Sequence, residues 1–459
     1  MSSRAERVTE EILHGNLVRA LFLLGWPIMV NTLIQTLYNV ADTFWVGHIP
    51  ETSRQALAAI NTSWPVVFLM ISLGTGFGIA GVAFISQARG AGDRDLMLRI
   101  LSQLYSLVLI FSASVSALGY FLTPYLLLPL GLEPQVRDLA DTYLRIIFLG
   151  IPFMFLTQLF SSTLRGVGET FIPMVVNGTS VAVNAVLDPF LIFGWGPFPE
   201  MGILGAALAT VVTRMAAAGV ALFLILRGVS DLKLVPRLMI PEPSLFARIL
   251  KVGLPSSFSN SLMALGFYLL MFIIARVRDG TTALAAYGLG DRVIHLMFIA
   301  VDGIAFSLST IIGQNIGAGQ FDRAEEAFRT AIKITFVILG IEAVVMLAFA
   351  RAIISFFTNS ELVVDEGARF LRIFVLGIPF FGVWRNVTSL YNGAGQTHVS
   401  LVLSAVRLWG FRLPLAYLLG LVLGLQSTGV WWGMALSNLF GALTAFTVLK
   451  YVDWRKKII

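Results

Sequence analysis

The stretch 20–42, ALFLLGWPIMVNTLIQTLYNVAD, is uncharged from Ala20 to Ala41 and ends on the carboxylate of Asp42. Such a run can cross the hydrocarbon core of a bilayer as an α-helix, which takes about 20 apolar residues. Asp188 follows a second uncharged run, from Thr170 to Leu187. An ionisable side chain within a bilayer is costly and faces a protein interior or a water-filled cavity, so both aspartates are candidates for a functional site.

The rest of the chain continues this apolar pattern. Of its 459 residues, 57% are hydrophobic and 13% charged, and the mean hydropathy is +0.83. Twelve segments are long and apolar enough to span a membrane: 17–47, 55–87, 99–124, 140–164, 169–195, 203–226, 248–276, 283–314, 329–357, 367–392, 397–424 and 429–451. The sequence therefore predicts an all-α integral membrane protein with twelve transmembrane helices and excludes an ordinary soluble domain.

The charges indicate how these helices are oriented. The net charge is +6, and the basic residues gather in alternate loops, at 4–19, 89–99, 227–251, 323–333 and 455–457. By the positive-inside rule, this asymmetry places both termini in the cytoplasm and makes the chain a multi-pass protein of the cell membrane. The basic residues form no stripe with aromatic ones, so we expect no nucleic-acid partner.

Several chemistries are disfavoured by composition. There is no cysteine, which excludes disulfides and thiolate metal sites, and the four histidines are scattered without metal-ligand spacing. We therefore expect no cofactor and no enzymatic activity. Nothing in the pattern calls for a protein partner, and we expect a monomer surrounded by membrane lipids.

The chain contains an internal repeat. Near-identical motifs of the first half recur in the second at an almost constant offset; they are Leu149–Pro152 and Leu376–Pro379, Gly166–Thr170 and Gly393–Thr397, Gly90–Gly92 and Gly317–Gly319, and Gly25–Pro27 and Gly253–Pro255. A near-constant offset over four separate motifs indicates duplication of a six-helix unit.

Two pseudo-symmetric six-helix bundles follow from this repeat. Because six helices return the chain to its starting side, both halves share one orientation, as in transporters built from parallel repeats. We expect an N-lobe at residues 1–228, a cytoplasmic linker at 229–250 and a C-lobe at 251–459. Substrates of such transporters bind near the interface of the repeats.

The two intramembrane carboxylates belong to the first half only. Asp42 and Asp188 each lie five or six residues before the outer end of a span, roughly 8–10 Å inside the boundary at 1.5 Å per residue. Asn184 shares the helix face of Asp188, and Thr210 on the returning helix reaches a similar depth. These oxygens could hold Na⁺ as a metal site. They could equally hold a proton, because like charges in a dry site disfavour double ionisation.

Other polar residues extend the same stripe of the first helix. Gln35, Tyr38 and Asn39 lie within two turns of Asp42, and Asn31 lies farther down. We interpret these four as candidates to line a substrate cavity. Pro27 lies below them and removes a backbone donor, so it is a candidate gating residue at which the helix bends.

The second half carries a different set of intramembrane charges. They are Asp302, Glu342, Arg385, Arg407 and Arg412, with Arg292 nearer the outer edge. Because buried unpaired charges are costly, we expect these residues to pair with each other. Such a network could be structural, or it could contribute to substrate binding or coupling.

The motifs of the first half resemble the multidrug and toxic compound extrusion (MATE) family, specifically its DinF-like, archaeal-type branch. The resemblance covers the whole chain and rests on Pro27, Val40–Thr43, Asn184–Pro189 and Gly205–Thr210. It implies a cation-driven antiporter with its coupling-ion site at Asp42, Asn184, Asp188 and Thr210, and bending of the first helix at the proline. The acidic residues that the NorM-like branch uses in the second half are absent, since 252–275 is uncharged and the tenth helix offers Arg385.

The resulting hypothesis is a secondary active antiporter that exports bulky amphipathic or cationic compounds in exchange for H⁺ or Na⁺. The alternative is a lipid or lipid-linked oligosaccharide flippase of the same superfamily, for which Arg385, Arg407 and Arg412 could supply a basic cavity. Headgroup translocation and drug efflux assays separate the two.

Overall fold

The fold is that of a helical membrane protein. The structure is a computed structural model that describes residues 4–49, 53–128 and 131–459, without the side chains of residues 39–41, 43, 47, 53 and 54. Within those ranges, 12 helical segments are long and apolar enough to cross a membrane. The prediction of an all-α protein with twelve transmembrane helices is confirmed.

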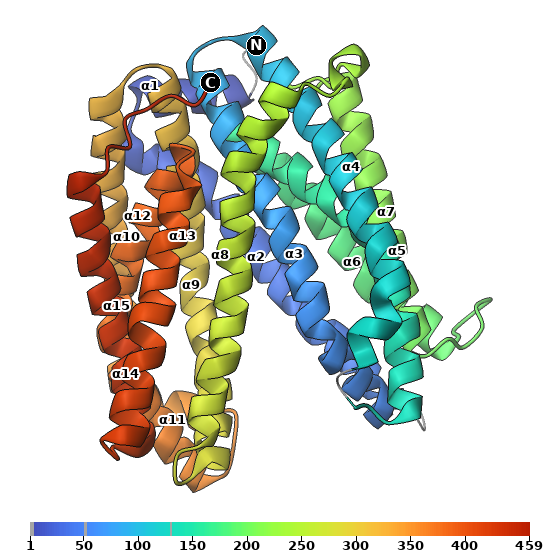
Figure 1. Ribbon diagram of the computed structural model, residues 1–459, viewed down its shortest axis with the longest axis vertical. Helices are drawn as coiled ribbons and strands as arrows, with labels where there is room; N and C mark the ends of the chain where they lie inside the picture. The colour runs from blue at the N-terminus through green and yellow to red at the C-terminus, as the bar shows by residue number, and fades with distance from the viewer. Residues whose placement is uncertain (1–3, 50–52, 129–130) are drawn as a thin grey trace. The chain divides into compact units, whose positions relative to one another are not determined.

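The first half of the chain contributes six of these spans, after a short amphipathic helix (Figure 1). Its helices are α1 (Arg4–His14), α2 (Leu17–Gly47), α3 (Ser53–Gly90), α4 (Arg94–Leu127), α5 (Pro134–Gly166), α6 (Phe171–Phe193) and α7 (Ile203–Arg227). The segment that follows contains the short 3₁₀ helix η2 (Pro236–Met239). In this half α5 packs against α3, α4 and α7, and α6 packs against α7.

The second half contributes the other six spans, two of which are interrupted helices. Its elements are α8 (Pro243–Ala275), α9 (Gly280–Gly317), α10 (Phe321–Ser355), α11 (Glu361–Phe374), η3 (Val375–Gly377), α12 (Ile378–Gly393), α13 (Thr397–Ala405), η4 (Val406–Arg412), α14 (Leu413–Tyr417), η5 (Leu418–Val422) and α15 (Gln426–Tyr451). Both η4 and η5 are π-helical and lie in the eleventh span. Single turns of π-helix within a helix are frequent at functional sites.

The chain forms two compact units. The first consists of Met1–Val8 and Val30–Ser257, and the second of Thr9–Met29 and Phe258–Ile459. This division differs from the expected one in that Thr9–Met29 groups with the second half. Close packing within the second unit explains the difference, because Gly25 lies against the backbone of Gly303.

Two of the spanning helices belong to both units, and each changes unit beside a proline. α2 does so between Met29 and Val30, just after Pro27, and α8 between Ser257 and Phe258, just after Pro255. These two prolines are the repeat-related pair of the sequence. Each removes one hydrogen bond from its helix, so each marks the weakest point of a span that connects the units.

The duplication is also visible in the backbone. Gly92 and Gly319, which are equivalent positions of the repeat, both adopt a left-handed conformation, with φ of 71° and 78°. Each ends a helix with the same pattern of bonds, from Asp93 N to the Ala88 carbonyl at 3.2 Å and from Gln320 N to the Asn315 carbonyl at 2.8 Å. Such helix ends require a residue without a Cβ clash, which explains why glycine stands at both positions.

Helices α6 and α7 approach each other unusually closely. A Cβ atom on Gly205 of α7 would lie 2.3 Å from the carbonyl oxygen of Leu191 in α6. Farther along the same pair, Ser180 Oγ donates to the Thr213 carbonyl at 3.2 Å. Small residues allow this kind of helix contact in lipid. The contact fixes the helix that carries Asp188 against the helix that carries Thr210.

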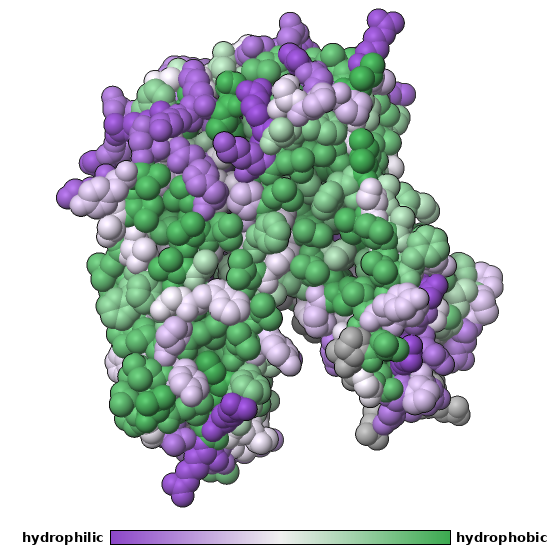
Figure 2. All heavy atoms as spheres, viewed as in Figure 1, coloured by the Kyte–Doolittle hydropathy of each residue, from purple (hydrophilic) through white to green (hydrophobic). Residues whose placement is uncertain are grey.

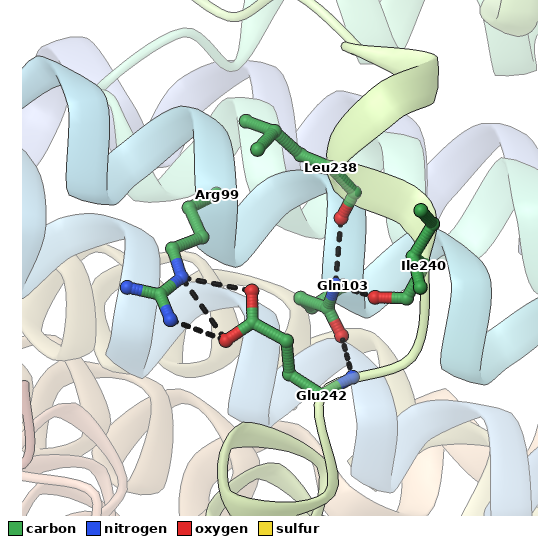
Figure 3. A network of polar contacts seen from close by, with 5 residues as sticks. All are labelled: Arg99, Gln103, Leu238, Ile240 and Glu242. Carbon is green, nitrogen blue, oxygen red and sulfur yellow. Dashed lines mark hydrogen bonds and ion pairs between the residues drawn. The ribbon is translucent and has the colours of Figure 1, made fainter.

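The segment between the halves is bound to α4 by side-chain contacts (Figure 3). Gln103 Nε2 donates to the carbonyls of Leu238 and Ile240, both at 2.6 Å, and its Oε1 accepts from Glu242 N at 2.9 Å. Arg99 Nε donates to the Glu242 carboxylate at 2.9 Å. Hydrogen bonds from Arg99 lower the pKa of Glu242, so this ion pair is present at neutral pH and is lost as the pH falls through that lowered value.

We predict that Gly205→Ala destabilises the protein by roughly 1–3 kcal/mol, because the added methyl group would overpack the α6–α7 contact. Gly219→Ala, in the same helix, is the matched control, since a Cβ there meets nothing within 4 Å. The control should be neutral or slightly stabilising, because alanine is the better helix former. Thermal unfolding in detergent measures both. Equal melting temperatures for the two variants would show that the close approach at Gly205 does not contribute to stability.

Candidate functional site

Asn184 and Asp188 form the buried part of the predicted site. They lie one turn apart on α6, and their side chains are 3% and 0% exposed. Asn184 Nδ2 lies 3.4 Å from Asp188 Oδ1, a long hydrogen bond. The other two oxygens, Asn184 Oδ1 and Asp188 Oδ2, are buried and accept no hydrogen bond from the described residues. Two oxygen acceptors without donors in a protein interior are costly unless a cation or a proton satisfies them.

Tyr38 connects the first helix to this region. Its hydroxyl lies 3.2 Å from Thr210 Oγ1 on α7, and either atom could be the donor. Asp42 follows one turn later on α2 and is half-buried. Residues four apart share a helix face, so Asp42 lies on the same side of α2 as Tyr38.

The carboxylates share an electrostatic environment. Asp188 interacts with the charge of Asp42, and Tyr38 interacts with both. Tyr143, on α5, also interacts with Asp42, Tyr38 and Asp188. Asp42 thus interacts with Asp188, which is hydrogen-bonded to Asn184, and Thr210 is connected to these residues through Tyr38. Their role in holding an ion stays a prediction.

Arg214 is a residue that the sequence analysis missed. It lies one turn after Thr210 on α7, and its Nη2 donates to Gln35 Oε1 at 3.3 Å. It also interacts electrostatically with Tyr38. Arg214 is the one charged residue between Ile203 and Leu226, a signal that could have found it. The polar stripe of α2 therefore has a cation beside it, in contact with Gln35 and Tyr38.

The other cavity candidates are less constrained. Gln35 is engaged by the guanidinium of Arg214, as described, and the side chain of Asn31 is half-buried. The side chain of Asn39 lies outside the described residues. Pro27 lies inside α2, which continues as a helix on both sides of it. Their roles stay predictions.

The expected ion-pair network of the second half exists only in part. Arg385 Nη2 lies 2.8 Å from Asp302 Oδ1, as the prediction required. The prediction is wrong for Glu342, whose Oε2 is buried and has no hydrogen-bond partner among the described residues. Arg292 is exposed and forms no ion pair within the part of the chain that the structure describes. Which side chains of different helices can pair depends on helix rotation, which the sequence does not specify.

Arg407 and Arg412 also depart from the prediction, because an amide in place of a carboxylate receives their hydrogen bonds. Both are buried, and Arg407 Nη1 and Arg412 Nη2 donate to Asn438 Oδ1 at 3.2 and 2.8 Å. Arg412 Nε donates to Ser437 Oγ at 3.0 Å. The guanidinium carbon of Arg407 lies 4.1 Å from the ring centre of Trp384. Cation–π contact replaces part of the lost hydration.

Three donors in this second cluster have no acceptor. Arg407 Nε, Trp384 Nε1 and Asn438 Nδ2 are buried without a hydrogen-bond partner among the described residues. This cluster thus has donors without acceptors, whereas the Asn184–Asp188 pair has acceptors without donors.

The chain matches one known family along most of its length. A family model described as MatE matches residues 27–190 and 255–418, one segment in each half of the repeat. The "Probable multidrug resistance protein YoeA" of Bacillus subtilis (strain 168) is 26% identical over 461 residues, which cover 100% of this chain and 98% of the relative. The "Probable multidrug resistance protein NorM" of Thermotoga maritima is 26% identical over 445 residues, which cover 96% and 94%.

A solved structure shares the fold. It is described as an outward-facing conformation of a multidrug resistance MATE family transporter of the MOP superfamily. Its TM-score is 0.90 at 24% identity, and the match covers 98% of each chain. The double match of the family model agrees with the internal repeat, and the structural match agrees with the twelve helices.

Proposed function

This chain belongs to the multidrug and toxic compound extrusion (MATE) family of membrane transporters, and on that premise we propose that it is a secondary active antiporter. It exports bulky amphipathic or cationic compounds in exchange for H⁺ or Na⁺ across the cell membrane, with both termini in the cytoplasm. The names of its relatives, two probable multidrug resistance proteins, support export of drug-like compounds. The family consists of transporters, which are not enzymes and need no cofactor.

One observation carries the coupling proposal. Asn184 Oδ1 and Asp188 Oδ2 are buried acceptors without donors among the described residues, beside the second carboxylate of Asp42. An oxygen set of this kind suits a hard cation such as Na⁺. It suits a proton equally well, because protonating one carboxylate removes the repulsion between the two. Asp188 and Asn184 would hold the ion, and Asp42 and the Thr210 hydroxyl would complete its surroundings.

Ion uptake would change both the charge and the packing of α2. A bound cation neutralises the site, so a cationic substrate nearby loses a source of attraction. By linkage, the ion and such a substrate must weaken each other's binding by the same factor. The hydrogen bond between Tyr38 and Thr210 offers a second route, because a change at Asp42 one turn away would alter how α2 lies on α7.

We predict that Asp42→Asn and Asp188→Asn each reduce gradient-driven export at least tenfold, because an amide cannot exchange a proton or bind Na⁺ as a carboxylate does. The measurement is dye export from reconstituted vesicles with separately imposed pH and sodium gradients, which also identifies the coupling ion. Asp322→Asn, an exposed carboxylate in the first turn of α10, is the control and should export normally. Normal export by both site variants under either gradient would eliminate the carboxylates as the coupling site.

Pro27 is the proposed bending point of α2. The helix leaves the second unit two residues later and enters the first, where it carries Tyr38 and Asp42. A helix that lacks a hydrogen bond at this point bends at lower cost than an unbroken one. The site could therefore change the direction of α2 without unfolding it.

We predict that Pro27→Ala slows export several-fold while ion binding is retained, because alanine restores the missing hydrogen bond and stiffens α2. Pro65→Ala, at an exposed proline inside α3, is the matched control. Transport and ion binding are measured on the same protein, by vesicle export and by isothermal titration. If the Pro65 variant slows export as much as the Pro27 variant, the effect is general and α2 has no special role.

The second cluster favours a second candidate function, translocation of an anionic lipid or lipid-linked cargo. Among the described residues, Arg407 and Arg412 are buried with amide and hydroxyl acceptors, and three donors of the cluster have no acceptor. Arg412 interacts electrostatically with Asp291, but neither guanidinium is hydrogen-bonded to a carboxylate among the described residues, and such groups would suit a phosphate.

These two candidate functions make opposite predictions for one variant. Arg412→Gln should abolish translocation of a fluorescent pyrophosphate-linked lipid if the cargo is anionic, because the charge that binds phosphate is lost. It should leave export of a cationic dye within about twofold if the cargo is a drug. Both assays are run on the same vesicles, with Arg292→Gln, an exposed arginine of the same unit, as the control.

A further inference from the structure

The second unit contains a cavity at one end of its membrane-spanning helices. It has a volume of about 770 Å³ and lies between α10, the end of α15 and the tail that follows α15. In Figure 2, hydrophilic side chains gather over this end of the second unit, and hydrophobic ones cover the helices beside it. The residues that line the cavity belong to neither polar cluster described above.

Among the charged residues that line this cavity, basic ones outnumber acidic ones. Four of them, Arg329, Lys333, Lys450 and Arg455, face two carboxylates. One carboxylate, Glu325, is already bound by Arg329 and Arg455, each at 2.5 Å. The cavity therefore keeps an excess of positive charge.

The two lysines are the available cations. Lys333 and Lys450 are exposed, and neither forms an ion pair within the described ranges. They come from different helices, α10 and α15, and converge on one cavity. Such a pair suits a single anionic group bound between two helices.

The neighbouring residues place this charge at the edge of the bilayer. Phe336 and Val337, one turn beyond Lys333 on α10, are 47% and 59% exposed. Phe446, one turn before Lys450 on α15, is 47% exposed. Exposed apolar side chains on spanning helices face lipid, so the lysines lie where the hydrocarbon core ends.

Two aromatic residues also lie at this cavity, at the expected level of the lipid headgroups. Tyr451 is 76% exposed and carries Lys450 Nζ at 5.8 Å from its ring centre, and Trp454 is buried in the cavity wall. Tyrosine and tryptophan are enriched at the level of lipid headgroups. The cavity thus combines cations, aromatic rings and an adjoining apolar surface.

We propose that this cavity is a binding site for the headgroup of an anionic phospholipid. The phosphate lies between Lys333 and Lys450, and the acyl chains run along Phe336, Val337 and Phe446. Basic pockets between membrane helices bind anionic headgroups elsewhere by the same combination. In the orientation proposed above, the site opens to the cytoplasmic leaflet. It does not depend on which compound is exported or which ion is coupled.

The test measures binding of phosphatidylglycerol to the purified full-length protein by native mass spectrometry and by its effect on thermal unfolding, with phosphatidylcholine in parallel. Phosphatidylglycerol should bind and raise the melting temperature, and phosphatidylcholine should not. Near a membrane each lysine contributes about fivefold to affinity for anionic lipid, so Lys333→Gln/Lys450→Gln should bind roughly 25-fold more weakly. Lys333→Arg/Lys450→Arg keeps the charge and should restore binding.

The controls separate this site from general charge and from free phosphate. Lys233→Gln/Lys251→Gln removes the same charge from exposed positions in the first unit and should bind lipid normally. Glycerol phosphate, the free headgroup, should not replace the lipid, because it lacks the chains. Equal binding of phosphatidylglycerol and phosphatidylcholine, or an equal loss in both glutamine double variants, would overturn the proposal.

Discussion

A carboxylate buried among membrane helices has no water to satisfy its oxygens, and in the first unit Asp188 finds only a long hydrogen bond from Asn184 among the described residues. One of its oxygens and one of the amide's remain without donors, a state that costs free energy unless a cation or a proton joins them. At Gly205, close to Asp188, α6 and α7 pack too tightly for a side chain larger than hydrogen. The proposed ion exchange depends on these two oxygens having no protein donor among the described residues.

The two halves share a fold and carry different polar clusters. Backbone details such as the left-handed glycines Gly92 and Gly319 recur at equivalent positions of the repeat, so the turn geometry is common to both halves. The polar clusters differ. Among the described residues, the cluster around Asp188 has acceptors that lack donors, and the cluster around Arg407 has donors that lack acceptors. A duplicated scaffold can keep its packing and change its polar cluster, because glycines and apolar residues fix the former and a few side chains fix the latter.

The spans could be predicted from sequence. Backbone polar groups within lipid must form their hydrogen bonds inside a helix, so the length of an apolar run identifies a spanning helix. The residues around Asp188 could be predicted because charge in an apolar run is rare, and depth then grouped Thr210 with it. Of the pairings across helices, that of Arg385 with Asp302 was predicted. The others could not be predicted, because they depend on helix rotation, which the sequence does not specify. Arg407 and Arg412 donate hydrogen bonds to Asn438, which no sequence motif singled out, and Arg214 donates to Gln35.

Continuity of the chain explains how a site within one unit could affect the other. Of the spanning helices, α2 and α8 belong to both units, and each crosses just after a proline, Pro27 or Pro255. Of these two helices, α2 alone carries a carboxylate of the proposed ion site, while the equivalent position of Asp42 in α8 is Leu270. Both helices lack a hydrogen bond at a proline. Only α2 also carries a charged group of the proposed ion site, and neutralising that group could shift the helix between bent and straight conformations. Under the proposed mechanism, ion sensing therefore belongs to α2, and α8 would bend without sensing the ion.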